Sequence, residues 1–178
     1  MMKRFVFLFL VNIFVTTVYS QVVIINGIDK NRLLTWEDFT GRPDKKSEHA
    51  AMASWKIYYS YQGISFNGDT AMLRGLKINL ELDKDRSWLK KGRETGDLLK
   101  HEQGHFNVGL LCQQEMLKQF TNTVFLKSGW QDKIQKLFNN ILDKYLQMDL
   151  KYDTETNHSK QKEMQQKWDS FFSTELNK

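Results

Sequence analysis

The stretch GDLLKHEQGHFNVGLLCQQEMLKQF, residues 96–120, decides the fold, because the hydrophobic period of the chain changes there. Its apolar residues recur every three or four positions, which predicts one long amphipathic helix. His101 and His105 are four residues apart, so their imidazoles lie one above the other on the same helix face. Cys112, seven residues past His105, is expected to line the core beneath them.

The segments before this helix have the period of two that is typical of half-buried strands. From residue 53 to 61 the odd positions are apolar or aromatic, and residues 76–83 alternate in the same way. Asn67-Gly68-Asp69 supplies turn chemistry between them, so the pattern predicts a hairpin of two long strands. Val22–Ile25 is β-branched and predicts a short first strand.

Three further segments are expected to be helical. Thr35 with Asp38 resembles a capping box, which predicts a short helical turn. Ser128 with Gln131 resembles another, at the start of a second helix that carries an apolar stripe. A third helix is predicted over residues 159–176. Strands followed by helices favour a single α+β domain.

The N-terminus has the features of an export signal. Two basic residues precede an apolar run over residues 5–15, and cleavage is expected after Ser20. An uncleaved membrane anchor is the alternative, but the run is shorter than the roughly 20 residues that span a bilayer, and Asn12 interrupts it. We therefore expect residues 1–20 to be a signal peptide and residues 21–178 to be one domain, periplasmic or extracellular.

The charge of the chain gives little indication of a nucleic-acid partner. Removing the two basic residues of the signal lowers the formal net charge from +5 to +3. The lysines are scattered and interleaved with acids, which is typical of a solvated surface. Cys112 is the single cysteine, so the exported domain cannot form an internal disulfide and must depend on its core, and on a metal where one is bound.

The pattern His101-Glu102-Gln103-Gly104-His105 predicts a zinc site. Two imidazoles one helical turn apart can reach the same ion at about 2.0–2.1 Å. Glu102 is turned away from the ligand face and is placed to take a proton from a water molecule bound to the metal. Zinc lowers the pKa of that water from near 16 toward about 7. Gln103 and Gly104 are unconstrained by this chemistry and are expected to serve as scaffold.

A catalytic zinc needs a third protein ligand and an open position. The extended signature with a third histidine six residues after the second is absent, since Leu111 stands there. The candidates are His158, an acid such as Glu155 or Glu163, and His49. His158 is favoured, because a short loop after a helix can bring its imidazole back to the first helix.

Two neighbours of these candidates have alternative roles. Tyr152 can donate a hydrogen bond to a developing oxyanion, or it can be a packed aromatic residue, which we favour. Asp153 can orient a metal-bound histidine from the second shell of the site, or it can cap the third helix.

Three stretches of the chain resemble a family of predicted secreted bacterial zinc-dependent proteases, long catalogued as a domain of unknown function. They are Leu34–Phe39 with the Gly41 and Pro43-Asp44 that follow, His101–Phe106, and Tyr152-Asp153, Thr156 and His158 followed by Gln161 or Gln165 and Trp168. The resemblance implies that His158 belongs to the site. One departure is Ser159, where the family tends to have glycine, which adopts a positive φ more easily.

These features together predict an exported zinc metallopeptidase with a zincin-like α+β fold. Its substrate is expected to be a peptide or protein and its cofactor Zn²⁺, with no membrane span once the signal is removed. Two alternatives stay open, namely a metal-stabilised binding module without activity and a zinc hydrolase of a non-peptide substrate. Glu102 favours a hydrolase, since a structural zinc would not require it, and structural zinc normally has four protein ligands.

Overall fold

The computed structural model describes residues 22–25, 28–29 and 33–177. The expected signal peptide, residues 1–20, lies outside this part of the chain. Among the helices of the described residues, none has the length and apolar character needed to cross a membrane.

The main sheet has four strands in the order β2-β1-β7-β4. The central β7 (Lys77–Leu82) pairs antiparallel with β4 (Trp55–Ser60) and parallel with β1 (Val22–Ile25), which in turn pairs with β2 (Ile28–Asp29). The alternating patterns therefore predicted β4, β7 and their antiparallel pairing correctly, and the short first strand is confirmed.

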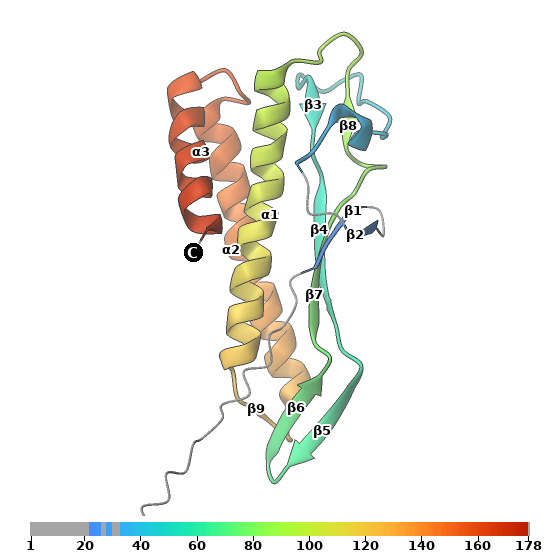
Figure 1. Cartoon of the computed structure of the whole chain (residues 1–178), viewed down its shortest axis with the longest axis vertical. Coiled ribbons are helices and arrows are strands. Elements are labelled where there is room, and N and C mark those ends of the chain that lie inside the picture. The colour runs from blue at the N-terminus through green and yellow to red at the C-terminus, as the bar shows by residue number, and fades with distance from the viewer. Residues whose placement is uncertain (1–21, 26–27, 30–32, 178) are drawn as a thin grey trace, which may run out of the picture.

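The connection between β4 and β7 differs from the single hairpin expected. It contains a second hairpin, made of β5 (Gly63–Asn67) and β6 (Thr70–Arg74), and β9 (Phe125–Leu126) adds a third strand to it. The turn lies where Asn67-Gly68-Asp69 indicated, with Gly68 at φ 56°. This small sheet extends the molecule at the end opposite the start of the third helix, at the bottom of Figure 1.

A second small pairing lies at the other end, where β3 (Ala51–Met52) pairs antiparallel with β8 (Trp88–Leu89). The predicted helical turn is present as a 3-10 helix, η1 (Trp36–Asp38), and the backbone N–H of Thr35 donates to Asp38 Oδ2 at 2.9 Å. These segments form the wall that faces the first long helix.

Three helices complete the α+β fold: α1 (Gly96–Asn122), α2 (Trp130–Thr156) and α3 (Lys162–Leu176). Helix α1 lies between the main sheet and the pair α2 and α3 (Figure 1). The capping box expected at Ser128 is wrong, because the N-cap is Gly129 at φ 79° and no side chain caps the helix. Glycine adopts the left-handed backbone conformation at little cost, and Gly129 therefore makes the turn into α2.

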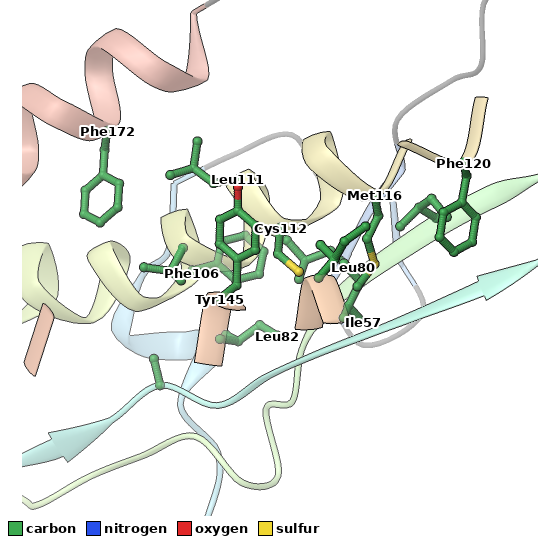
Figure 2. Close-up of a cluster of buried hydrophobic side chains, with 14 of the residues drawn as sticks. Ile57, Leu80, Leu82, Phe106, Leu111, Cys112, Met116, Phe120, Tyr145 and Phe172 are labelled. Carbon is green, nitrogen blue, oxygen red and sulfur yellow. The ribbon is translucent and has the colours of Figure 1, made fainter. Parts of the chain in front are cut away.

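The core lies between the sheet and α1, and it continues between α1 and α2 (Figure 2). Cys112 is fully buried within it, as expected, and burial raises the pKa of its thiol to about 12. A neutral buried thiol is a packing residue, not a nucleophile. The labelled core residues of Figure 2 are Ile57, Leu80, Leu82, Phe106, Leu111, Cys112, Met116, Phe120, Tyr145 and Phe172.

The turn between α2 and α3 has three successive non-glycine residues in the left-handed region: Asn157 (φ 46°), His158 (φ 50°) and Ser159 (φ 73°). This backbone conformation costs an L-residue about 1–2 kcal/mol, and serine has no side-chain geometry that removes this cost. The turn is retained because its amides are bonded, for example His158 N–H to the carbonyl of Asp153 at 3.2 Å.

Replacing Ser159 by glycine is therefore expected to raise the free energy of unfolding by about 0.5–1 kcal/mol, after the extra chain entropy of glycine is subtracted. Urea denaturation measures the change. Ser170→Gly, inside the exposed face of α3, is the matched control, and it is expected to lower stability by about 0.5 kcal/mol. Equal destabilisation by both substitutions would contradict the strain at Ser159.

Candidate metal centre

A cleft of about 1190 Å³ lies where the first half of α1 and the end of α2 face the segment from β3 to β4. It is lined by the backbone and side chains of residues 50–55 on one wall and by the helices on the other. All four histidines of the chain line this cleft: His49, His101, His105 and His158.

Two imidazole nitrogens and one carboxylate oxygen converge inside the cleft. Asp153 Oδ1 lies 3.2 Å from His101 Nε2 and 3.2 Å from His105 Nε2. Three ligands at about 2.0–2.1 Å from a tetrahedral zinc would be roughly 3.3–3.4 Å apart, which is close to these separations. His101, His105 and Asp153 are thus a candidate metal-ligand triad, with ligand atoms within 4.8 Å of one another.

The other ring nitrogen of each histidine is held by a partner of its own. His105 Nδ1 lies 2.8 Å from Asp149 Oδ1, and His101 Nδ1 lies 3.2 Å from Gln165 Oε1. With Nδ1–H donating to these acceptors, Nε2 of each ring is left as the basic nitrogen, the arrangement that metal-binding histidines commonly have.

The charges of the triad are strongly coupled. Burial alone lowers the pKa of the His105 imidazole, but hydrogen bonds with Asp149 and Asp153 outweigh burial and raise it to about 10. Burial alone raises the pKa of the Asp153 carboxyl, but hydrogen bonds from His101 and His105 hold it well below its usual range. Positive charge is therefore favoured between these side chains, and a divalent cation would supply it in place of the proton.

Glu102 is buried beside the triad, with 2% of its surface exposed, and its carboxylate lines the cleft. Burial raises its pKa, against the opposing charges of His105 and His101. Its Oε2 accepts the backbone N–H of Ala53 at 2.7 Å, which fixes the direction of the carboxylate. Glu102 is therefore anchored to the opposite wall of the cleft and lies outside the candidate triad.

Gln103 and Gly104 position the motif helix. Gln103 Oε1 accepts the backbone N–H of Leu34 at 2.8 Å and so ties the Leu34–Phe39 segment to α1. Gly104 lies against Tyr152, whose hydroxyl donates to the carbonyl oxygen of His101 at 2.9 Å. Both residues are scaffold, as expected from their lack of a role in metal binding.

Tyr152 is a packed aromatic residue. Its side chain is fully buried, and its ring stacks on His101 with centroids 4.9 Å apart. The hydroxyl is also bonded to the Gln165 amide at 2.8 Å, so it is directed into the interior. The oxyanion role considered for Tyr152 does not fit this placement, and the ring supports the back of His101 instead.

Replacing Gly104 by alanine is expected to lower the free energy of unfolding by about 1–3 kcal/mol through overpacking. A Cβ at this position would lie 2.2 Å from the Tyr152 hydroxyl oxygen and 2.4 Å from its Cζ, both parts of a rigid ring. Thermal denaturation measures the loss. Gly96→Ala in the same helix is the control, since a Cβ there meets nothing within 4 Å. An unchanged Tm for Gly104→Ala would contradict the close contact.

The other candidates for a third ligand lie outside the triad. His158 is bonded to the triad, with its Nδ1 3.0 Å from Asp153 Oδ1. Glu155 Oε2 accepts the indole N–H of Trp168 at 2.8 Å, and Glu163 is exposed at the start of α3. His49 is exposed on a loop, and its ring lies 4.2 Å from that of His158.

The reason for this arrangement is the length of α2, which continues to Thr156. Asp149 and Asp153 are therefore one turn apart on a helix face that points at His101 and His105. The capping role considered for Asp153 is wrong, because the N-cap of α3 is Gln161. His158 comes after the helix end, as predicted, but it reaches the carboxylate of Asp153.

Asp149 and Gln165 are the contacts that sequence reasoning did not identify. Ile141, Tyr145 and Tyr152 follow one another along the apolar stripe of the second helix, and all three are buried. Extending the helix along this stripe would have put Asp149 and Asp153 on one face. Gln165 belongs to the closing motif of the family resemblance, but its contact with His101, 64 residues away in the sequence, follows from no local spacing.

Fold and site together define an α+β domain with a candidate metal-ligand triad of two histidines and one carboxylate in a cleft. The chain belongs to the family described as "Bacterial protein of unknown function (DUF922)", whose model matches residues 34–159. The resemblance drawn from the three motifs is confirmed at the level of this family, whose description states no activity. Comparisons with curated proteins and with solved structures find no match.

Proposed function

We propose that this protein is an exported zinc metallopeptidase in which His101, His105 and Asp153 hold the metal and Glu102 is the general base. The observation that carries the proposal is the convergence of two histidine Nε2 atoms on one carboxylate oxygen, beside a buried glutamate and within a cleft. A structural metal would require neither the glutamate nor the cleft.

The donor set fits zinc. Two imidazole nitrogens and one carboxylate oxygen leave a fourth position open, which is the pattern of catalytic zinc. When bound, zinc would supply Lewis acidity, which makes water nucleophilic near neutral pH and polarises a carbonyl group. Asp149 and Gln165 would keep the two imidazoles in the required tautomer.

Glu102 provides the proton transfer. As water adds to the amide carbon, a C–O bond forms, the carbonyl π electrons move to oxygen, and Glu102 takes the proton of the water. When the C–N bond breaks, the same carboxyl returns the proton to the leaving amine. Its anchor on Ala53 N–H keeps one carboxylate oxygen occupied, so the other is the one that accepts the proton.

An extended peptide suits the wall formed by β3. Ala50 C=O accepts Lys90 N–H at 2.8 Å, so in an antiparallel ladder the backbone groups of Ala51 point away from β8. They face the same side as Ala53 N–H, which donates to Glu102. A substrate strand that paired there would bring its carbonyl group toward the triad, which supports a peptide over a compact substrate.

The two basic residues and the apolar run that follows them over residues 5–15 support export. A signal peptide over residues 1–20 and a periplasmic or extracellular location remain part of the proposal. N-terminal sequencing of the protein isolated from cell fractions tests both points.

The test of the activity is incubation of residues 21–178 with a mixed peptide library and added zinc, with and without a chelator. We expect cleavage that the chelator stops and added zinc restores. Zinc binding without cleavage of any peptide would favour the binding module or a hydrolase of another substrate class. Cleavage that is insensitive to chelation would exclude the metal mechanism.

A further inference from the structure

The small sheet of β5, β6 and β9, here called the end sheet, projects from the molecule at the end far from the cleft (Figure 1). Its outer face is apolar and exposed, and the proposed peptidase function makes no use of it. We propose that the end sheet docks on a membrane surface that contains anionic lipids. Its apolar side chains would enter the headgroup region, and the basic side chains around them would meet the anionic headgroups.

The strand pairing determines which side chains of the end sheet are exposed. Ala71 and Phe125 are opposite each other in the register of β6 and β9, and both are buried, so this face packs on the core. Side chains alternate along a strand, so the neighbours of these two residues point to the other side. Met72, Val124 and Leu126 therefore form the outer face, where they are 47%, 60% and 51% exposed.

Basic side chains are held directly beside exposed apolar ones. Phe66, in β5, is a fourth exposed apolar residue of this sheet, and Lys127 Nζ lies 5.5 Å from the centre of its ring. Lys133 Nζ donates to the carbonyl oxygen of Val124 at 2.9 Å. Membrane-surface binding combines buried apolar area with electrostatic attraction to anionic lipids, and both components are present here.

The positive charge of the chain is concentrated around the end sheet. Residues 61–77 and 117–137, which form the sheet and the helix ends beside it, contain six basic and two acidic residues. Their net charge is therefore +4, against +5 for the whole chain. All six basic residues are exposed: Arg74, Lys77, Lys118, Lys127, Lys133 and Lys136. Each basic residue that reaches an anionic surface raises the partition coefficient about 5-fold, so this charge complements anionic lipids.

A lipid surface fits this end of the molecule better than a folded protein does. Lysine is depleted in protein–protein interfaces, whereas Lys127 and Lys133 lie among the apolar side chains of the end sheet. The sheet also projects from the end of the molecule, so its side chains can enter the headgroup region without rearrangement (Figure 1). The alternative is pairing with a second copy through the outer edge of β5, since β5 pairs only with β6 among the described strands.

Docking by the end sheet would hold the cleft away from the lipid. Helix α1 connects the two ends, and His105 is roughly 25 Å from the end of the helix at Asn122, at a rise of about 1.5 Å per residue. The cleft would then stay in water, beyond the reach of a segment that is embedded in the bilayer.

Vesicle sedimentation tests the docking. Residues 21–178, the chain expected after removal of the signal, are mixed with vesicles of phosphatidylcholine alone or with an equal amount of phosphatidylglycerol. We expect binding to the mixed vesicles at low salt, and binding to the neutral vesicles that is weaker by about 10-fold or more. Salt at about 1 M, where the Debye length is about 3 Å, should release most of the protein.

Single substitutions locate the binding surface. Leu126→Ser and Lys127→Gln should each lower the partition coefficient about 5-fold. The matched controls are Leu150→Ser and Lys91→Gln, at exposed positions near the cleft end, and both should bind as the wild type does. All four side chains are exposed, so the fold should be kept, and circular dichroism checks this.

A fluorescent label tests which end meets the lipid. Cys112 is buried, so a thiol-reactive dye that senses polarity would label only an added cysteine. We expect the emission of a dye on Leu126→Cys to shift to the blue when mixed vesicles are added. The emission of the same dye on Leu150→Cys should stay unchanged. A blue shift at Leu150→Cys as large as that at Leu126→Cys would overturn the orientation.

Three other results would contradict the proposal: no binding to the mixed vesicles, equal binding to both kinds of vesicle, or losses in the controls that equal those in the end sheet. A concentration-dependent dimer that Leu126→Ser abolishes, without vesicle binding, would make the end sheet an interface between copies instead. None of these measurements depends on peptide cleavage, so a failure of the peptidase proposal leaves them unaffected.

Discussion

Replacing Glu102 by glutamine is expected to abolish peptide hydrolysis while the zinc stays bound. The change removes the proton acceptor, which should lower kcat by about 10²–10⁴-fold. The fold should be kept, because the glutamine amide oxygen can still accept the Ala53 N–H that Glu102 accepts at 2.7 Å. Zinc content by atomic emission and steady-state kinetics with a cleaved peptide are the two measurements.

The matched control is Glu48→Gln, which makes the same chemical change at an exposed residue of the same cleft. It should keep the kcat of the wild type. Full activity of the Glu102→Gln protein would show that Glu102 is not the base. Loss of zinc from it would show instead that the carboxylate belongs to the ligand set.

Replacing Asp153 by asparagine is expected to have the largest effect on metal binding. An amide oxygen carries no negative charge, so the metal would lose the anionic ligand that now lies 3.2 Å from each of the two Nε2 atoms. Loss of a partner outside the ligand set lowers metal affinity about 10–100-fold, so loss of a ligand should lower it by more than about 100-fold. Competition with a chromogenic zinc chelator measures the dissociation constant.

Two variants set the scale for this result. Asp143→Asn, at an exposed position of the same helix, should leave zinc affinity unchanged. Asp149→Asn, which removes the partner of His105 Nδ1, should lower it about 10–100-fold. If Asp153→Asn kept its zinc and His158→Ala lost it, the ligand set expected from the motifs would be right and the triad of the structure would not be the metal site.

Local pattern predicted most of the fold, because the elements concerned bury one regular face. The alternation in β4 and β7 and the helical period of α1 are direct consequences of this. The inserted hairpin of β5 and β6 was not predicted, since its residues are partly exposed and show weaker alternation. The pairs of residues in β3 and β8 carry no sequence pattern, because their pairing depends on contacts between distant segments.

The same distinction applies to the site. His101, Glu102 and His105 share one helix, and their relative placement follows from its geometry. Asp153, which meets both histidines, lies in α2 about fifty residues further along the chain. Which residue of α2 reaches the histidines depends on where that helix ends. The polar run from Lys151 to Asn157 resembles a loop, yet Tyr152 and Thr156 within it are fully buried and keep it helical. One buried face was enough to continue the helix.

The contact between Gly104 and Tyr152 has a consequence for comparing related chains. The residue at position 104 is limited by a ring on another helix, because a Cβ would lie within 2.2 Å of the hydroxyl that bonds the His101 carbonyl. We expect the two positions to covary among relatives, so that a larger residue at the first accompanies a smaller one at the second. The glycine inside the histidine motif, together with a tyrosine immediately before the aspartate, would then serve as a paired signature for recognising chains with this centre.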